Sequence, residues 1–252
     1  MPSRRRPVAV VTGAAHGIGL AIARRLADDH AVAAVDREGD RLADADLPDG
    51  VHRVVGDIAA DPEPWLAEVT AALGTPSVLV NNAAMPESGR GFLDLPMPEV
   101  RRSLETTLVG TWGLTRAVVT RMTAAGTGGS VVFISSLHAE RVRLYPDYSV
   151  AKAGLRMLAK ELADELGPHG IRVNSVSPGA IDTWSDQRPG GAERRAATDA
   201  IVPLGRMGTP DDVAAAVAFL ADPAASGYVT GADLRVDGGL DQFNWLHHLG
   251  NA

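Results

Sequence analysis

The stretch that decides the fold is residues 8–19, which read VAVVTGAAHGIG. An apolar run leads into a turn with glycine at positions 13, 17 and 19, and an amphipathic helical pattern follows. A short apolar run bounded by turn residues predicts a buried strand, and glycine lets a backbone turn tightly and approach a ligand closely. We therefore expect a strand, a tight turn and a helix whose free N-terminal N–H groups face a phosphate.

The same alternation of apolar runs and helical patterns continues along the chain. The runs that predict strands cover residues 8–11, 31–35, 51–55, 78–80, 130–134, 172–176 and 234–236. The patterns that predict helices cover residues 18–28, 64–73, 99–123, 149–166 and 211–220. Several apolar runs are continuous, as in parallel strands buried on both faces. We expect one α/β domain over residues 1–252, a Rossmann-like doubly wound parallel sheet of about seven strands with helices on both faces.

Composition excludes several classes of site. The 252 residues include no cysteine, which rules out disulfides, thiolate nucleophiles and cysteine-bound metals. The formal net charge of −7 argues against nucleic-acid binding, and the only basic run, residues 4–6, reads as a solvated face. No apolar stretch approaches the length of a membrane span or a signal sequence. We expect a soluble cytoplasmic protein that binds neither membranes nor nucleic acids.

One long connection, residues 182–208, carries prolines, a Gly190-Gly191 pair and mixed charges. Loops of this length in compact domains are usually lids, binding loops or disordered segments. The connection follows a Pro178-Gly179 turn at the end of a predicted strand, the edge at which such sheets bind ligands. We expect it to be a lid over a substrate.

Asp36 ends the second predicted strand, seventeen residues beyond Gly19. A carboxylate there can accept hydrogen bonds from the adenosine ribose hydroxyls and repels a 2′-phosphate, so NAD is expected over NADP. Arg37 complicates this choice, because a guanidinium could bind that phosphate. Asp36 could also be only a turn residue that ends the strand. His16, inside the glycine turn, reads as an exposed filler rather than a ligand or base.

Tyr148 and Lys152 lie four residues apart in a predicted helix and therefore share a face. Hydride transfer to or from a carbon also requires a proton to move on the attached oxygen. A free tyrosine has a pKa of about 10, and a nearby ammonium lowers that pKa toward neutrality. Most isolated pairs of this spacing are ordinary helix surface, but this pair follows a dinucleotide-type turn.

Six motifs in order resemble those of the short-chain dehydrogenase/reductase family and cover essentially the whole chain. After the Gly13, Gly17, Gly19 turn they are Asp57, Asn81-Asn82-Ala83-Ala84, Ser135-Ser136, Tyr148 with Lys152, Asn174-Ser175-Val176-Ser177-Pro178-Gly179 and Val236-Asp237-Gly238-Gly239. The family usually has glycine where Ala84 stands, a difference of one methyl group.

The resemblance implies a role for each matching residue. Asp57 and Ile58 would flank the adenine, Asn82 would lie along the cofactor with Ala83 and Ala84, and Ile181 and Thr183 would hold the nicotinamide carboxamide. The full cofactor-binding set expected is Gly13, His16, Gly17, Ile18, Gly19, Asp36, Arg37, Asp57, Ile58, Asn82, Ala83, Ala84, Tyr148, Lys152, Pro178, Gly179, Ile181 and Thr183.

The resemblance also implies the catalytic set. Tyr148 would be the general acid/base, assisted by Lys152, and Ser136 rather than Ser135 would orient the substrate oxygen. Thr107 stands where the family usually has an asparagine that anchors a water of the proton relay. Tyr145 is a rival phenol, but no lysine follows it four residues later.

The segments around Ser136, Met85 and residues 178–183 resemble the bacterial glucose dehydrogenase branch, which implies a sugar or polyol substrate. A 3-ketoacyl group or a cyclic or secondary-metabolite ketone is an equal rival, and a cofactor-binding regulator that has lost catalysis is a further alternative. The usual oligomeric state of the family it resembles, together with the apolar segment 243–249, implies a homotetramer, or a dimer. His247 and His248 alone are poor evidence for a metal, and we expect none.

Overall fold

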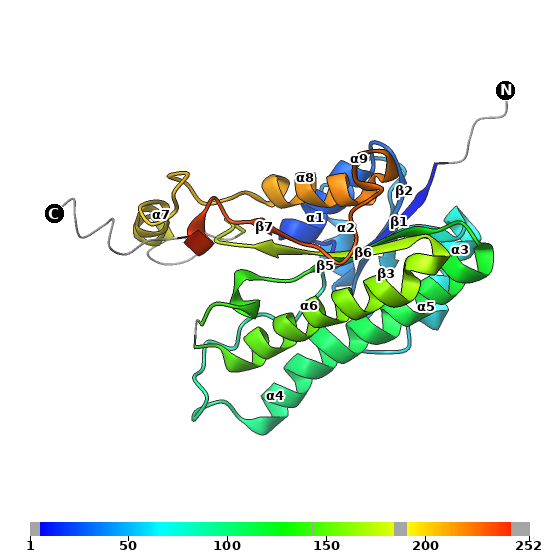
Figure 1. The fold of residues 1–252 in the computed structure, drawn as a ribbon. Helices are drawn as coiled ribbons and strands as arrows, with labels where there is room; N and C mark the ends of the chain where they lie inside the picture. The colour runs from blue at the N-terminus through cyan, green and yellow to red at the C-terminus, as the bar shows by residue number, and fades with distance from the viewer. Residues whose placement is uncertain (1–5, 143, 184–190, 243–252) are drawn as a thin grey trace.

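Seven parallel strands form one sheet in the computed structural model, which describes residues 6–142, 144–183 and 191–242 (Figure 1). The order across the sheet is β3-β2-β1-β4-β5-β6-β7. The strands are β1 (Val8–Thr12), β2 (Ala31–Asp36), β3 (His52–Val55), β4 (Pro76–Asn81), β5 (Gly129–Ile134), β6 (Ile171–Pro178) and β7 (Asp233–Val236). From β1 the chain adds β2 and β3 on one side, and it then adds β4 to β7 on the other side of β1. Ligands of such sheets bind where the order reverses, here at the carboxyl ends of β1 and β4.

Helices cover both faces of the sheet (Figure 1). One face carries α1 (Gly17–Leu26) and α8 (Pro210–Ala221), and the other carries α3 (Glu63–Leu73), α5 (Thr111–Ala125) and α6 (Pro146–Leu166). The remaining described helices are α2 (Gly39–Ala43), α4 (Met97–Leu104), α7 (Gly191–Asp199) and α9 (Pro223–Ser226), and the shorter turns are η1 (Glu105–Gly110), η2 (Leu137–Ala139), η3 (Gly167–His169) and η5 (Leu240–Gln242). None of the helices described could cross a membrane, since none is both long and apolar enough.

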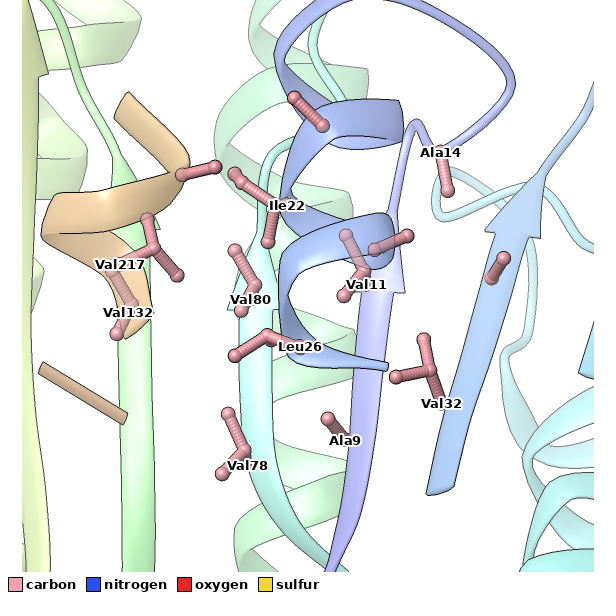
Figure 2. Close-up of a cluster of buried hydrophobic side chains, with 14 of the residues drawn as sticks. Ala9, Val11, Ala14, Ile22, Leu26, Val32, Val78, Val80, Val132 and Val217 are labelled. Carbon is pink, nitrogen blue, oxygen red and sulfur yellow. The ribbon is translucent and has the colours of Figure 1, made fainter. Parts of the chain in front are cut away.

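The apolar runs form two cores because successive strand residues point to opposite faces of the sheet. Ala9 and Val11 pack against Ile22 and Leu26 of α1, whereas Val10 between them belongs to the core under α3, α5 and α6 (Figure 2). Val217 of α8 closes the first core beside Val132 (Figure 2). The continuous apolar runs therefore reflect burial on both sides, and the expected α/β class is confirmed.

The prediction of one continuous helix over residues 99–123 is wrong. Residues 99–123 read as a single helix, but the chain forms α4, then the π-helical turn η1, then α5. At the end of η1, a Cβ atom on Gly110 would lie 2.5 Å from the carbonyl oxygen of Ile58. The wide turn thus lies where Gly110 approaches the backbone of Ile58, a contact that hydrophobic periodicity does not indicate. Such π turns occur often at functional sites.

The connection 182–208 is not loop throughout, because its described part contains α7. Its two ends lie together: Ile181 forms a parallel bridge with Gly208, and the Asp182 N–H donates to the Gly208 carbonyl at 2.8 Å. Arg195 of α7 forms an ion pair with Asp182. The sequence pattern missed this helix because it is short, polar and carries no apolar stripe. Residues 184–190, the apolar segment 243–249 with His247 and His248, and Arg4 and Arg5 lie outside the described residues.

Candidate active site

The glycine turn joins β1 to α1 and leaves no room for a side chain at Gly13 or Gly19. Gly17 has a φ of +56°, which L side chains rarely adopt. A Cβ atom on Gly19 would lie 2.0 Å from the Gly13 carbonyl oxygen and 2.5 Å from Asn82 Nδ2. The start of α1, where Ile18 lies, carries no side-chain cap hydrogen bond from His16. This cradle suits a phosphate.

His16 precedes α1 with extended backbone and makes no side-chain cap. Its side chain is half-buried, and burial is the main cause that lowers the pKa of its imidazole, with the charge of Arg41 second. His16 therefore stays neutral near pH 7. It is less exposed than the filler expected from the sequence.

Asp36 lies at the end of β2 and is 8% exposed. Its carboxylate accepts from two backbone N–H groups, Ala15 and Glu38, each at 3.0 Å. The carboxylate thus fixes the glycine turn against β2, and it keeps lone pairs for ribose hydroxyls, because a carboxylate can accept about four hydrogen bonds. Arg37 is exposed, and its guanidinium makes no ion pair or hydrogen bond within the described part of the chain.

Asn82 holds the turn from β4. Its Nδ2 donates to the carbonyls of Thr12 and Gly13, at 2.9 and 3.1 Å. The Thr12 hydroxyl in turn accepts from the backbone N–H groups of Asn82 and Ala83, both at 3.1 Å. Sequence reasoning missed Thr12, although a polar residue that ends an apolar strand was a usable signal. The Asn82 amide therefore positions the cradle, with Ala83 and Ala84 half-buried beside it.

Asp57 and Ile58 follow β3 and differ in exposure. Asp57 is exposed, and its carboxylate accepts from the Ala59 N–H at 2.9 Å, a local turn contact. Ile58 is 5% exposed and packs in the core under α3 and α5. Both lie at the carboxyl end of β3, as expected, but the Ile58 side chain packs in that core.

The segment after β6 closes the other side of the cradle. The Gly179 N–H donates to the Val236 carbonyl at 2.9 Å, and a Cβ atom on Gly179 would lie 2.7 Å from the Asp237 Cβ. Pro178 ends β6, and Ile181 and Thr183 follow it. Thr183 lies next to the glycine turn, because a Cβ atom on Gly17 would contact the Thr183 Cγ2 at 3.6 Å.

Tyr148 and Lys152 lie on α6, with the Lys152 Nζ 5.6 Å from the centroid of the Tyr148 ring. Lys152 is 3% exposed, and its Nζ donates to the Ile134 carbonyl at 2.7 Å. Burial lowers the pKa of the Lys152 ammonium to about 8. Among the described residues, the bond to Ile134 is the one hydrogen bond of this ammonium, so its charge is costly to bury beside the phenol.

The two serines after β5 have different partners. The Ser135 hydroxyl donates to the backbone carbonyl of Lys152 at 3.0 Å and so anchors α6. The Ser136 oxygen accepts from the His138 N–H at 3.1 Å, which starts η2. The His138 ring lies edge-on to Tyr148, with centroids 6.3 Å apart. His138, a residue that the sequence analysis did not assign, therefore contacts both: its N–H bonds Ser136 and its ring lies beside Tyr148.

Thr107 lies in the π-helical turn η1 and is 1% exposed. Its hydroxyl accepts from the Met85 N–H at 3.1 Å, which ties η1 to the segment after Asn82. The side chain therefore bonds a neighbouring segment. Two surface pockets, of about 280 Å³ between α3 and α5 and about 490 Å³ beside β7, are lined by none of the candidate residues.

The lowered pKa of Lys152 makes a prediction about stability. Between about pH 8 and 10.5 the unfolded chain binds more protons than the folded chain, so stability due to this group rises with pH. We expect the free energy of unfolding of the parent, measured in urea, to rise over that pH range relative to that of Lys152→Met. At pH 7 the variant should be more stable, by about 1–3 kcal/mol.

Lys160→Met, at an exposed position of the same helix, is the matched control and should follow the parent. Equal pH dependence of the parent and Lys152→Met would show that the buried ammonium does not carry a lowered pKa.

Comparison with known proteins agrees with this geometry. Residues 13–241 match a family model described as enoyl-(acyl carrier protein) reductase. The chain is 38% identical to L-rhamnose 1-dehydrogenase (NAD(P)(+)) of Azotobacter vinelandii, over 92% of this chain and 95% of that one. It is 37% identical to (3R)-3-hydroxyacyl-CoA dehydrogenase of Mus musculus, over 94% of this chain and 96% of that one.

The solved structures agree. A short-chain type dehydrogenase/reductase from Mycobacterium marinum superposes with a TM-score of 0.83 and 31% identity, covering 93% of this chain and 95% of that one. The model match and the relatives each span most of the chain, and the cradle, Tyr148 and Lys152 all lie within the matched residues. The chain belongs to the short-chain dehydrogenase/reductase family.

Proposed function

We propose that this oxidoreductase interconverts a secondary alcohol and a ketone with Tyr148 as general acid/base, assisted by Lys152 and Ser136. The observation that carries the proposal is the buried Lys152 ammonium, whose Nζ lies 5.6 Å from the centroid of the Tyr148 ring. A charge so costly to bury is typical of functional sites rather than of packing. When bound, the nicotinamide of the cofactor accepts or supplies the hydride.

The proton path follows from the side chains. In the oxidative direction, the Tyr148 oxygen takes the proton of the substrate hydroxyl, and in reduction it returns that proton to the ketone oxygen. The Lys152 ammonium favours the ionised phenol by its charge. The Ser136 O–H donates to the substrate oxygen, while its own oxygen is held by the His138 N–H. Thr107, held at the Met85 N–H, would anchor a water of the relay.

The residues present fit a dinucleotide. We place the pyrophosphate on Gly13, His16, Gly17, Ile18 and Gly19, and the adenosine ribose on Asp36. Asp57 and Ile58 would flank the adenine, with Asn82, Ala83 and Ala84 along the cofactor. Pro178, Gly179, Ile181 and Thr183 would border the nicotinamide, supported by the proximity of Thr183 to Gly17.

We propose that NAD is preferred to NADP. Asp36 is fixed by two backbone N–H groups, so its charge cannot swing away from a 2′-phosphate. Arg37 is exposed and would attract such a phosphate, so NADP is the secondary cofactor in this proposal. The A. vinelandii relative carries both cofactors in its name, NAD(P)(+).

The cofactor preference is measured by the ratio of kcat/KM with NAD to that with NADP. We expect the ratio to exceed about ten, the factor that corresponds to 1.4 kcal/mol. Asp36→Ala should lower the ratio by removing the repulsion, and Arg37→Ala should raise it. A parent ratio below one would contradict the proposed role of Asp36.

For the substrate we propose a sugar or polyol, supported by the L-rhamnose 1-dehydrogenase relatives from two bacteria. The equal rival is a 3-hydroxyacyl group, supported by the (3R)-3-hydroxyacyl-CoA dehydrogenases of mouse and rat. A cyclic alcohol is a third class, since cis-4-hydroxycyclohexanecarboxylate dehydrogenase of Sinomonas cyclohexanicum is 40% identical. The connection 182–208 would act as the lid that chooses among them.

The proposal is tested by an absorbance assay of cofactor reduction with L-rhamnose, a (3R)-3-hydroxyacyl-CoA and cis-4-hydroxycyclohexanecarboxylate. Tyr148→Phe should lower kcat by about 10²–10⁴ and leave the Kd for NADH unchanged, because only the proton-transfer group is lost. Tyr145→Phe, the rival phenol, should retain turnover.

Full turnover of Tyr148→Phe, or its loss in Tyr145→Phe alone, would move the chemistry to another residue. If the parent binds NADH but converts neither alcohols nor ketones, the protein is instead a cofactor-binding regulator that has lost catalysis.

We also propose that residues 1–252 form one domain and that the enzyme is a homotetramer, or a dimer. Exposed apolar side chains on neighbouring helices support the assembly: Val109 and Trp112 are 51% and 56% exposed, and Val150 and Met157 are 59% and 55% exposed. Nicotinamide dinucleotides are held inside the cell, so the proposal places the enzyme in the cytoplasm.

Light scattering should therefore give a mass about four times 26.3 kDa, or about twice that mass for a dimer. Trp112→Glu should lower that mass, because a charge would have to be buried in the helix interface. A monomeric parent would contradict the proposed assembly.

A further inference from the structure

A cluster of charged side chains, none of them in the proposed catalytic set, joins four segments: the end of η2, α6, β7 and η5. We call it the ion network; it consists of three arginines and three carboxylates, Arg141, Arg156, Arg235, Glu140, Asp233 and Asp241. Glu140 and Arg141 directly follow η2, and Arg156 lies on α6 one turn after Lys152. Asp233 and Arg235 belong to β7, and Asp241 to η5.

Glu140 is the centre of this network. Its Oε1 lies 2.6 Å from the Arg156 Nη2, and its Oε2 lies 2.6 Å from the Arg235 Nη2. Arg156 also lies 3.4 Å from the Asp233 Oδ2. One carboxylate therefore ties the end of η2 both to the helix that carries Tyr148 and Lys152 and to the edge strand β7.

The remaining members close the network. Asp241 is bonded through its Oδ1 to the Arg141 Nε at 2.5 Å and through its Oδ2 to the Arg235 Nη1 at 2.6 Å. The Asp233 Oδ1 accepts from the Ser175 and Ser177 hydroxyls, at 2.5 and 2.8 Å. Each carboxylate therefore has two or more charged or hydroxyl partners.

Three members of the network are largely buried: the side chains of Asp241, Asp233 and Arg156 are 4%, 11% and 14% exposed. Glu140, Arg235 and Arg141 are 43%, 38% and 61% exposed, so Glu140 bridges a buried partner, Arg156, and an exposed one, Arg235. Surface pairs hold geometry weakly, whereas charges that share several hydrogen bonds away from water have few alternative partners. Hydrogen bonds from Arg156 and from Arg141 lower the pKa of Glu140 and of Asp241, so both carboxylates stay ionised near neutral pH.

The backbone between Ser136 and Glu140 transmits this anchoring. The Ala139 N–H donates to the Ser136 carbonyl at 3.0 Å, and the N–H groups of Glu140 and Arg141 donate to the Leu137 carbonyl at 3.0 and 2.8 Å. With the Ser136 side chain capping the same turn, the segment is one hydrogen-bonded unit. A displacement at Glu140 is therefore also a displacement at Ser136.

We propose that Glu140 is a positioning residue, which sets the Ser136 hydroxyl relative to Tyr148 through its pairs with Arg156 on the catalytic helix and Arg235 on β7. The Ser135 bond to the Lys152 carbonyl fixes one end of the serine segment on α6, and the Glu140 pair fixes the other end one turn further along. This inference rests on the proposed function, because it assigns Ser136 to the substrate oxygen.

The kinetic test uses Glu140→Gln, which removes the charge and keeps the size. We expect kcat to fall by about ten-fold or more, since a shift on the order of 1 Å in a reacting group costs up to about 10². KM and the Kd for NADH should stay within two-fold, because neither ligand touches Glu140. Arg156→Gln should have the same effect, the double variant should be no worse than either single one, and Arg156→Lys should restore part of kcat.

Glu165→Gln is the matched control, an exposed glutamate at the far end of α6, and should behave as the parent. Turnover is expressed per NADH-binding site, so a loss of folded protein does not count as a loss of kcat. A kcat for Glu140→Gln within two-fold of the parent would overturn the proposal, even if the variant melted at a lower temperature.

Hydrogen exchange separates this inference from the proposed function. Amides of residues 137–141 should exchange faster in Glu140→Gln than in the parent, while those of β1 should not change. If the parent turned over no substrate, the proposed function would fail, and the exchange measurement would still decide the anchoring. Unchanged exchange in residues 137–141 would then overturn it.

Discussion

The close approach of the glycine turn to β4 is the constraint on which the ligand edge of this protein depends. A Cβ atom on Gly19 would lie 2.0 Å from the Gly13 carbonyl oxygen, so any other residue would push α1 away from the sheet. Asn82, which follows β4, fixes the turn through Thr12 at the end of β1, and Asp36 fixes it from β2. The ends of three strands are thereby held around one helix N-terminus.

The buried Lys152 ammonium is the second feature that the fold must support. Its burial lowers the pKa of the amine to about 8, which is a cost to the folded state at neutral pH. The two apolar cores on either side of the sheet supply the stability that offsets such a cost. A charge retained under these conditions fits the proposed proton chemistry at Tyr148, since packing alone would favour an apolar side chain.

The ion network connects this chemistry to the edge of the sheet. Short turns such as η2 have little packing of their own, and their position depends on what holds their ends. Here Ser135 and Glu140 hold the two ends of the serine segment on the same helix. The positions of Ser136 and Tyr148 would therefore respond to changes in β7 and η5, although neither element contains a residue of the proposed catalytic set.

The sequence by itself determined the class of fold, the order of its elements and the glycine turn, because buried parallel strands, amphipathic helices and tight turns leave local patterns. Motif order also determined the family. Only the tertiary structure decided the π-helical turn that interrupts residues 99–123, the helix α7 within the connection 182–208, and the partners of Thr107, Ser135 and Asn82. The π-helical turn and these partners depend on contacts between segments 17 to 70 residues apart, such as the Asn82 amide on Thr12 and the Ser135 hydroxyl on Lys152, which no local periodicity records. The helix α7 was missed because it is short and polar. The same reason explains the ion network: Glu140 and Arg235 are 95 residues apart in the chain and meet only because η2 and β7 lie at the same edge of the sheet.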